Sequence, residues 1–359
     1  MRVSVEIAAA ADDEAIRGLL KRQPIPGRVT LAFEREPSFA IGCAVTGENP
    51  VVLVARSDDR QVVGVACRSV RHVYVNGRAE RIGYLGQLRI DERFRGRWLV
   101  SRGFAQLAEI DRSDPLPAYL VSIAEGSDEA REVLVRKRRA SFPEFHDVAE
   151  YRTLALSLHR APVTSRADRD DMVPGSIEQI PEIVEFLRAQ GARRQLFPVW
   201  SAAMLRGLER VGLGIGDLRI ARRDGRIAGV MALWDQSAYK QSVIRDYAGW
   251  LKVASWLGGS IVPRVGNHVR SAYAALVAIA NDDSTVFRRL LGEVSAAAAA
   301  RGFQYLIVGL DARDPLLAVA RAHRHIAYRS RLYLASWPNG ACLHERLDQR
   351  PVYVDVATL

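Results

Sequence analysis

Apolar and polar residues alternate along several stretches of residues 1–160, and this period of two predicts strands. The runs Pro50–Arg56 and Gln61–Val75 both alternate, and the polar segment Ser57–Arg60 between them predicts a β-hairpin. The dipeptide Asn76-Gly77 predicts a second tight turn, which leads into a strand at Arg81–Ile90. The other elements expected in this half are a strand at Val3–Ala8, a helix from Asp12 or Asp13 to about Lys21, a loop and short helix within Gln23–Asn49, a buried strand at Ala118–Ala124, a helix at Asp128–Arg138, and one or two closing strands at Phe145–Leu158.

A basic, glycine-containing turn, Glu92–Arg97, follows the strand Tyr84–Ile90 and precedes a helix that starts near Trp98. The apolar residues of this helix recur on one face and are Leu99, Phe104, Leu107 and Ile110. The turn carries three arginines, Arg93, Arg95 and Arg97. Free N–H groups and the positive end of the dipole at a helix N-terminus attract anions. The segment therefore predicts a phosphate site, or alternatively a solvated basic loop.

The segment Leu88–Arg97 resembles the acetyl-CoA pyrophosphate loop of the GNAT N-acyltransferases, whose pattern is Q/R-x-x-G-x-G/A. In the best register Arg95 takes the first position, while Trp98 and Val100 stand where the pattern has small residues. Glycine at such positions lets the backbone approach a pyrophosphate closely, so both departures bear on cofactor binding. The order of elements in residues 1–160 is also that of a GNAT fold.

A similar order of elements recurs after the polar segment Ala161–Ser176, which has the composition of a linker. The expected elements are a helix at Ile177–Gln190, a hairpin of Asp217–Arg222 and Gly229–Trp234, a buried strand at Ala272–Ala280, a helix at Val286–Arg301, a strand at Gln304–Leu310, a helix around Pro315–His323 and a closing strand at Ile326–Trp337. This half resembles a degenerate GNAT domain. Its turn Asn281–Thr285 is acidic and lacks glycine, so we expect Asp283 or Ser284 to cap a helix and no cofactor to bind there.

These patterns together predict an α/β fold with a mixed sheet, built from two tandem GNAT-like domains. The expected divisions are a first domain at residues 1–160, a linker at 161–176, a degenerate domain at 177–340 and a C-terminal tail at 341–359. The resemblance implies that the first domain is the working one.

Composition narrows the classes of function. A hydrophobic share of 48% and a charged share of 26% are ordinary for a soluble globular protein, and no apolar stretch is long enough to span a membrane. The N-terminal residues include acids where a signal peptide needs an apolar core, and Cys43, Cys67 and Cys342 form no metal motif, so we expect a cytoplasmic protein without a metal. The net charge of +10 suggests an anionic partner. The arginines are scattered, which favours a phosphate-bearing cofactor over nucleic acid.

Candidate acid–base residues are few. The resemblance implies a carboxylate or histidine on the strand before the loop, where this chain has Leu85. Glu80 is the nearest upstream carboxylate and is the candidate base, with a solvated turn residue as the alternative. The tyrosine that serves as general acid in the family falls at Leu134, which leaves Tyr84 and Tyr119 as substitutes unless they are core residues. An aromatic group in the second half lines an acceptor pocket or belongs to the core: Trp234, Tyr239, Tyr247, Trp250 and Trp256, with Arg245 and Lys252.

The resemblance implies an N-acyltransferase that uses acetyl-CoA or a related acyl-CoA and a small-molecule or peptide amine, in the cleft between the domains. The candidate catalytic residues are Glu80 and Tyr84. The implied cofactor-binding residues are Leu88, Arg89 and Ile90 on the strand and Arg95, Gly96, Arg97, Trp98, Leu99, Val100 and Ser101 at the turn. One alternative is a non-catalytic GNAT-fold protein that binds a ligand or partner, because the acid–base and small-residue positions are lost. Another is a basic nucleic-acid binder, which requires the arginines to gather on one face.

Overall fold

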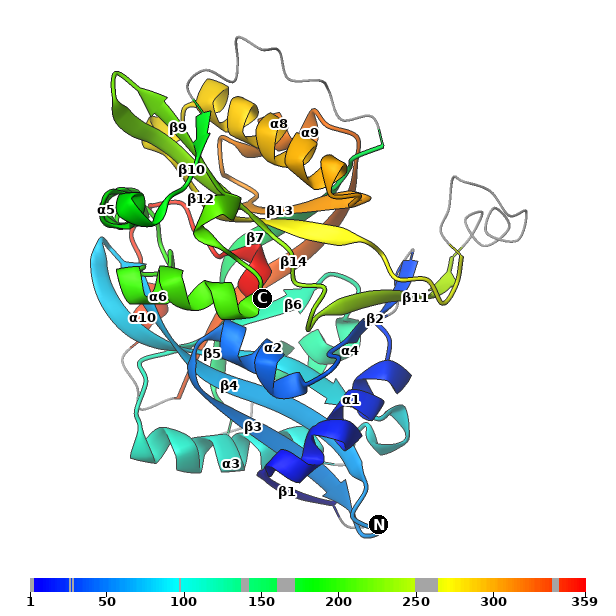
Figure 1. Ribbon diagram of the computed structural model, residues 1–359. Helices are drawn as coiled ribbons and strands as arrows, with labels where there is room; N and C mark the ends of the chain where they lie inside the picture. The colour runs from blue at the N-terminus through cyan, green and yellow to red at the C-terminus, as the bar shows by residue number, and fades with distance from the viewer. Residues whose placement is uncertain are drawn as a thin grey trace.

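The computed structural model describes residues 3–25, 27, 29–96, 98–136, 142–159, 172–248, 264–337 and 342–359. These residues form one mixed sheet of 12 strands, with helices on its faces, and a separate sheet of two strands. The two halves of the chain stack along the large sheet, and the C-terminus lies between them (Figure 1).

The first half follows the predicted order closely. Its elements are β1 (Val3–Ile7), α1 (Asp13–Arg22), β2 (Val29–Glu34), α2 (Phe39–Thr46), β3 (Glu48–Ser57), β4 (Val62–Val75), β5 (Arg78–Ile90), α3 (Leu99–Ser113), β6 (Tyr119–Ala124), α4 (Asp128–Arg131) continued by a π-helical turn at Glu132–Arg136, and β7 (Glu144–Ser157). The turn between β4 and β5 forms at Asn76-Gly77, where both residues have positive φ as a two-residue hairpin loop requires.

The second half repeats this order. Its elements are β8 (Met172–Pro174), α5 (Ile180–Gly191), α6 (Ala202–Gly207), β9 (Leu218–Arg223), β10 (Arg226–Trp234), β11 (Gln241–Tyr247), β12 (Ser271–Ile279), α8 (Ser284–Ala300), β13 (Tyr305–Asp311), α9 (Leu317–Arg321), β14 (His325–Ser336) and α10 (Leu343–Arg346). The predicted cap of α8 is confirmed, because the Asp283 carboxylate accepts hydrogen bonds from the amides of Thr285 and Val286.

The two halves exchange their closing strands. The order of the large sheet is β1-β3-β4-β5-β6-β14-β7-β13-β12-β10-β9-β8, so β14 lies between β6 and β7. The last strand of the second half thus pairs with β6, while β7 of the first half pairs with β13. The sequence patterns predicted both closing strands but left each with its own half. An alternating pattern shows that a segment is a strand and which of its faces is buried, but it does not show which strand it pairs with. The exchange therefore has no signal in the local sequence.

A second link between the halves is the two-stranded sheet of β2 and β11, in which Phe33 lies opposite Ser242. The sequence analysis expected only a loop and a short helix where β2 lies. The partner of β2 is more than 200 residues away along the chain, so no hairpin pattern announces it. In Figure 1 this sheet reaches across the space between the two halves.

The segments expected as linker and tail contribute to the folded body. Residues 161–171 of the expected linker lie outside the described residues, whereas Met172–Pro174 form β8 and pair with β9. In the expected tail, Val352, Tyr353 and Val354 are buried in the largest hydrophobic core, which spans both halves. No described helix combines the length and apolar character needed to cross a membrane.

Candidate functional site

Strands β5 and β6 diverge in the middle of the first half. They pair in parallel only from Gly83 opposite Tyr119 to Leu85 opposite Val121. Just beyond this point Gln87 has a positive φ of 59°, and the register of β4 against β5 shifts. A β-bulge of this kind bends a strand away from its neighbour. The bulge therefore opens a slot between the ends of β5 and β6.

The slot belongs to a large cavity between the two halves, with a volume of about 2390 Å³. Ordinary small-molecule sites enclose roughly 300–1,000 Å³. The walls come from β5, β6 and α3 of the first half and from β12, β14 and α8 of the second. The linking strands β2 and β11 contribute Leu31, Phe33 and Ile244 to an apolar wall. The cavity is thus roomy enough for more than one ligand.

The N-terminus of α3 forms one end of the slot, and Leu99, Val100 and Gly103 line the cavity there. Gly96 has a φ of 74°, and a Cβ built on it would meet no atom within 4 Å. Trp98 has a φ of 59° and is 64% exposed. Glycine adopts positive φ more readily than any other residue. Trp98 therefore has the backbone conformation expected of a glycine, although it carries a large side chain.

The arginines of this turn differ in their surroundings. Arg93 pairs with Asp91, with 2.8 Å between Nη2 and Oδ2, and this guanidinium lowers the pKa of the Asp91 carboxyl. Arg95 is exposed beside Gly96. Arg97 lies outside the described residues. The helix N-terminus at the start of α3 and the positive charge of Arg95 are the features that suit a phosphate.

The second half contains the matching bulge. Strands β12 and β13 pair in parallel from Ser271 to Tyr273 only, and Leu276, three residues after Tyr273, has a φ of 52°. Gln87 likewise lies three residues after Tyr84. Tyr84 and Tyr273 therefore occupy equivalent positions in the two halves.

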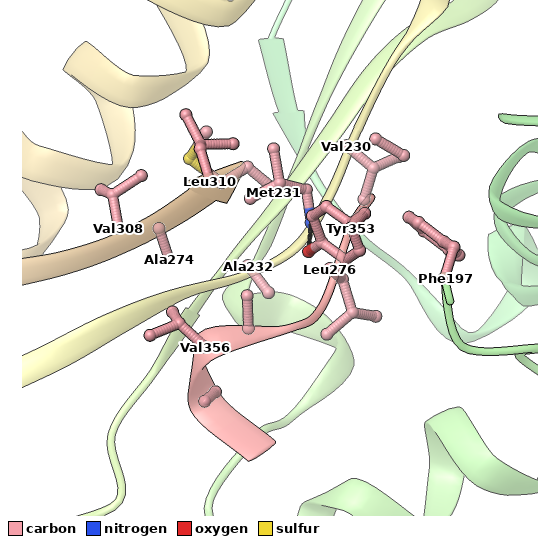
Figure 2. Close-up of a cluster of buried hydrophobic side chains, with 14 of the residues drawn as sticks. Phe197, Val230, Met231, Ala232, Ala274, Leu276, Val308, Leu310, Tyr353 and Val356 are labelled. Atoms are coloured by element: carbon pink, nitrogen blue, oxygen red, sulfur yellow. Dashed lines mark hydrogen bonds between the residues drawn. The ribbon is translucent and has the colours of Figure 1, made fainter. Parts of the chain in front are cut away.

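In the second half, however, the C-terminal segment fills the slot, as Figure 2 shows for Tyr353 and Val356. The Tyr353 hydroxyl accepts a hydrogen bond of 3.0 Å from the amide of Val277, and an Asp355 carboxylate oxygen accepts one of 2.8 Å from that of Leu276. Burial raises the pKa of Asp355, although the hydrogen bond from the amide of Leu276 acts in the opposite direction. The amides of Leu276 and Val277, beside the bulge of the second half, are thus already bonded.

At the inner end of the open slot, Tyr84 packs against a buried arginine. The guanidinium of Arg71 lies 3.8 Å from the centre of the Tyr84 ring and donates to the carbonyl oxygens of Thr46 and Thr358. Burial lowers the pKa of Arg71 to about 10. Burial also raises the pKa of the Tyr84 phenol, while the charges of Arg71 and Arg35 oppose that rise. Tyr84 is therefore a neutral phenol at neutral pH.

Lys240 lies across the cavity beside Tyr273. Its Nζ is 4.5 Å from the centre of the Tyr273 ring and 3.4 Å from the main-chain oxygen of Leu359. Burial lowers the pKa of Lys240 to about 7; the charge of Arg35 acts in the same direction, and that of Asp355 opposes it. An amine with this pKa can accept a proton at neutral pH. Sequence reasoning missed Lys240, because an isolated lysine in a loop before a strand carries no motif.

Arg35 was missed for the same reason. Its side chain is buried between the two halves and lines the cavity. Nη1 donates to the carbonyl oxygen of Glu34 and Nη2 to Oε1 of Gln87, each over 3.1 Å. Burial lowers the pKa of this guanidinium, and the nearby phenols of Tyr273, Tyr239 and Tyr84 counter the effect.

The other candidates from sequence lie in varied places. Glu80 is not among the residues that line the cavity; its Oε1 pairs with Nη2 of Arg346 at 2.7 Å near the start of β5. Tyr119 donates a hydrogen bond of 2.5 Å to Asp111, and burial raises its pKa. Leu134 does line the cavity. Glu80 thus forms an ion pair outside the cavity lining, and its role as a base stays a prediction.

The aromatic group of the second half is divided. Trp234 is a core residue whose Nε1 donates a hydrogen bond of 2.8 Å to the carbonyl oxygen of Val211, and Tyr239 is buried. Tyr247 lines the cavity. Trp250, Lys252 and Trp256 lie outside the described residues. Within the part of the chain that is described, no cluster of histidine, cysteine or acidic residues is arranged to hold a metal ion.

No family model matches the sequence, and no curated protein does. Solved structures share the fold over nearly the whole chain. Saccharomyces cerevisiae N-myristoyltransferase with bound myristoyl-CoA matches 92% of this chain and 82% of its own with a TM-score of 0.63 at 10% identity. A second structure of that enzyme with myristoyl-CoA matches 98% and 85%, with a TM-score of 0.63 at 11% identity.

A glucosamine N-acetyltransferase region of a fungal multi-domain β-N-acetylglucosaminidase matches 93% of this chain, with a TM-score of 0.63 at 15% identity, and this chain spans 38% of its length. Similarity at this level of identity shows the fold alone. The predicted fold, an α/β mixed sheet of two tandem GNAT-like units, is confirmed.

Proposed function

We propose that the protein transfers an acyl group from an acyl-CoA, bound along β5 and α3, to an amine bound in the central cavity. The observation that carries this proposal is the contrast between the two slots. The first is open from the start of α3 to Tyr84, while Tyr353 and Asp355 fill the second. A fold that keeps one slot open and closes its copy is suited to one extended cosubstrate.

The cosubstrate would bind as the resemblance implies. Main-chain groups of Leu88, Arg89 and Ile90 hold the pantetheine on the edge of β5 that β6 has left. The start of α3, at Leu99–Ser101, together with Arg95 and Gly96, holds the pyrophosphate. Of these residues, Leu88, Arg89, Ile90, Leu99 and Val100 line the cavity, and the others are their neighbours in the chain. The structures of N-myristoyltransferase contain myristoyl-CoA, and the apolar wall of β2 and β11 makes acyl groups longer than acetyl worth testing here.

Two side chains supply the proton transfers. The acceptor nitrogen attacks the thioester carbonyl, a C–N bond forms, and the C–S bond breaks. Lys240 accepts the proton that the amine loses, as its pKa of about 7 permits. Tyr84, a neutral phenol at the inner end of the slot, gives a proton to the departing thiolate. The products are an amide and a free thiol.

The test combines binding with turnover. Calorimetric titration with acetyl-CoA, octanoyl-CoA and myristoyl-CoA should give a micromolar dissociation constant for at least one, weakened tenfold or more by Arg95→Ala. Arg226→Ala is a matched control, because Arg226 is exposed at the start of β10 and does not line the cavity. Release of free thiol in the presence of a panel of amines then reports transfer.

The outcomes separate the candidate functions. Absence of binding by all three thioesters contradicts the acyltransferase proposal. Binding without thiol release for any amine favours the non-catalytic alternative, in which the fold serves to hold a ligand.

A further inference from the structure

The charge on the cavity wall is one-sided. Among the described residues that line the cavity, Glu125 has the only acidic side chain, and it lies 3.5 Å from Arg329. Arginine and lysine side chains occur on the walls of both halves, including Arg35, Arg89 and Lys240 near the middle. A cavity lined by one sign of charge attracts ligands of the opposite sign. The phosphate site proposed at the start of α3 explains the positive charge at one end of the cavity. It does not explain the positive charge in the middle.

Arg35 is the cation whose position is most firmly built. Only 4% of it is exposed, and its stem packs so closely on α2 that a Cβ at Gly42 would lie 2.9 Å from Cδ of Arg35. It donates its two hydrogen bonds to neutral oxygens, the main-chain carbonyl of Glu34 and the side-chain amide of Gln87. No described carboxylate forms a salt bridge with it. A buried charge without a counter-ion is costly, so an anion that enters the cavity gains a strong partner here.

The free part of the guanidinium suits a carboxylate. One N–H on each terminal nitrogen is already used, which leaves one N–H on each for a ligand. These remaining N–H groups can donate to the two oxygens of one carboxylate, an anion that arginine binds with strong, charge-assisted hydrogen bonds.

Lys240 and Tyr84 both lie near Arg35. The charge of Arg35 is close enough to affect the pKa of Lys240 and that of the Tyr84 phenol. Arg35, Lys240 and Tyr84 also line the same cavity, so a ligand whose carboxylate binds Arg35 shares that space with the residue that accepts a proton and with the inner end of the slot.

We propose that the acceptor is an amino acid, whose carboxylate pairs with Arg35 while its amine faces Lys240 and the thioester. This assignment rests on the proposed acyl transfer, because it names the acceptor of that reaction. The products are an N-acyl amino acid, whose acyl chain lies along the apolar wall of β2 and β11, and the free thiol in the slot.

The test uses product-like ligands, so it does not require turnover. N-octanoylglycine and N-octanoylphenylalanine are titrated by calorimetry, each against its own primary amide. We expect at least one acid to bind tenfold or more tightly than its amide in the unaltered protein. We expect Arg35→Met to reduce that ratio to about one, with circular dichroism to verify folding. Arg226→Met, at an exposed site away from the cavity, should leave the ratio unchanged.

The unaltered protein alone can overturn the assignment, even where Arg35→Met does not fold. Equal binding of acid and amide, or no binding of either, contradicts it. So does a preference for the acid that survives in folded Arg35→Met. If the acids bind through Arg35 but no thioester is consumed with any amino acid, the carboxylate site stands and the acyl transfer fails.

Discussion

Nη2 of Arg35 donates a hydrogen bond of 3.1 Å to Oε1 of Gln87, the residue of positive φ in β5. This bond connects the buried cation of the central cavity to the bulge that separates β5 from β6. The residue that opens the cosubstrate slot thus also orients the group that we assign to the acceptor. Two ligand sites share one structural element.

Gln87→Glu tests this connection. A carboxylate at this position would form an ion pair with Arg35, so the guanidinium would no longer be available to the carboxylate of a ligand. We expect a higher free energy of unfolding and at least tenfold weaker binding of N-octanoylglycine. Gln87→Met is the control, since it removes the acceptor without adding charge. Chemical denaturation and calorimetry measure both effects, and unchanged ligand binding in Gln87→Glu would contradict the shared role.

The filled slot of the second half should be a source of stability. Tyr353→Phe keeps the ring and removes the hydroxyl that accepts a hydrogen bond from the amide of Val277. A buried N–H left without a partner costs about 1–3 kcal/mol. We expect the free energy of unfolding to fall by that amount in urea denaturation. Tyr328→Phe, at a tyrosine that is 39% exposed, should change it little.

The low pKa of Lys240 predicts how stability depends on pH. Its pKa in the folded protein, about 7, lies below the ordinary value of 10.5 for a lysine, so the unfolded chain holds the proton more tightly. The cost of burying the charge is complete below pH 7 and disappears as the pH rises to about 10.5. Lys240→Met should therefore stabilise the protein most at pH 6, by roughly 4–5 kcal/mol, and progressively less above pH 7.

Unfolding measured in parallel for the two proteins between pH 6 and 10 checks this, since Arg35, Asp355 and Tyr273, the groups near Lys240, are common to both. A difference in stability that stays constant over this range would show that Lys240 titrates normally.

Trp98→Gly tests the register of the pyrophosphate turn. A non-glycine residue in the left-handed region costs about 1–2 kcal/mol, so glycine should stabilise this turn and expose more backbone. We expect acyl-CoA to bind the variant at least as tightly as the unaltered protein in a calorimetric titration. Loss of binding would mean that the exposed indole itself contacts the cosubstrate.

The elements of both halves were predictable because their signals are local. The Asn76-Gly77 turn, the alternation of β4 and β5 and the cap at Asp283 each act over a few residues. The exchange of β7 with β14 and the pairing of β2 with β11 depend on contacts between distant segments, which alternation does not encode.

The site was predictable only in part for a related reason. Tyr84 and the residues from Leu88 to Ser101 lie on one continuous stretch with a motif. Arg35 and Lys240 come from different halves and meet only because β2 and β11 pair and bring them to one cavity. A single charged residue far from any motif has no pattern that distinguishes it from a surface residue.

The central claim is that the first slot, and not the second, receives an acyl-CoA. Hydrogen–deuterium exchange with and without saturating octanoyl-CoA tests it at the level of single segments. The proposal predicts slower exchange at residues 86–90 and 99–101 and no change at residues 276–279, where Asp355 and Tyr353 already bond the amides of Leu276 and Val277. Protection confined to residues 276–279, or protection in neither segment, would contradict it.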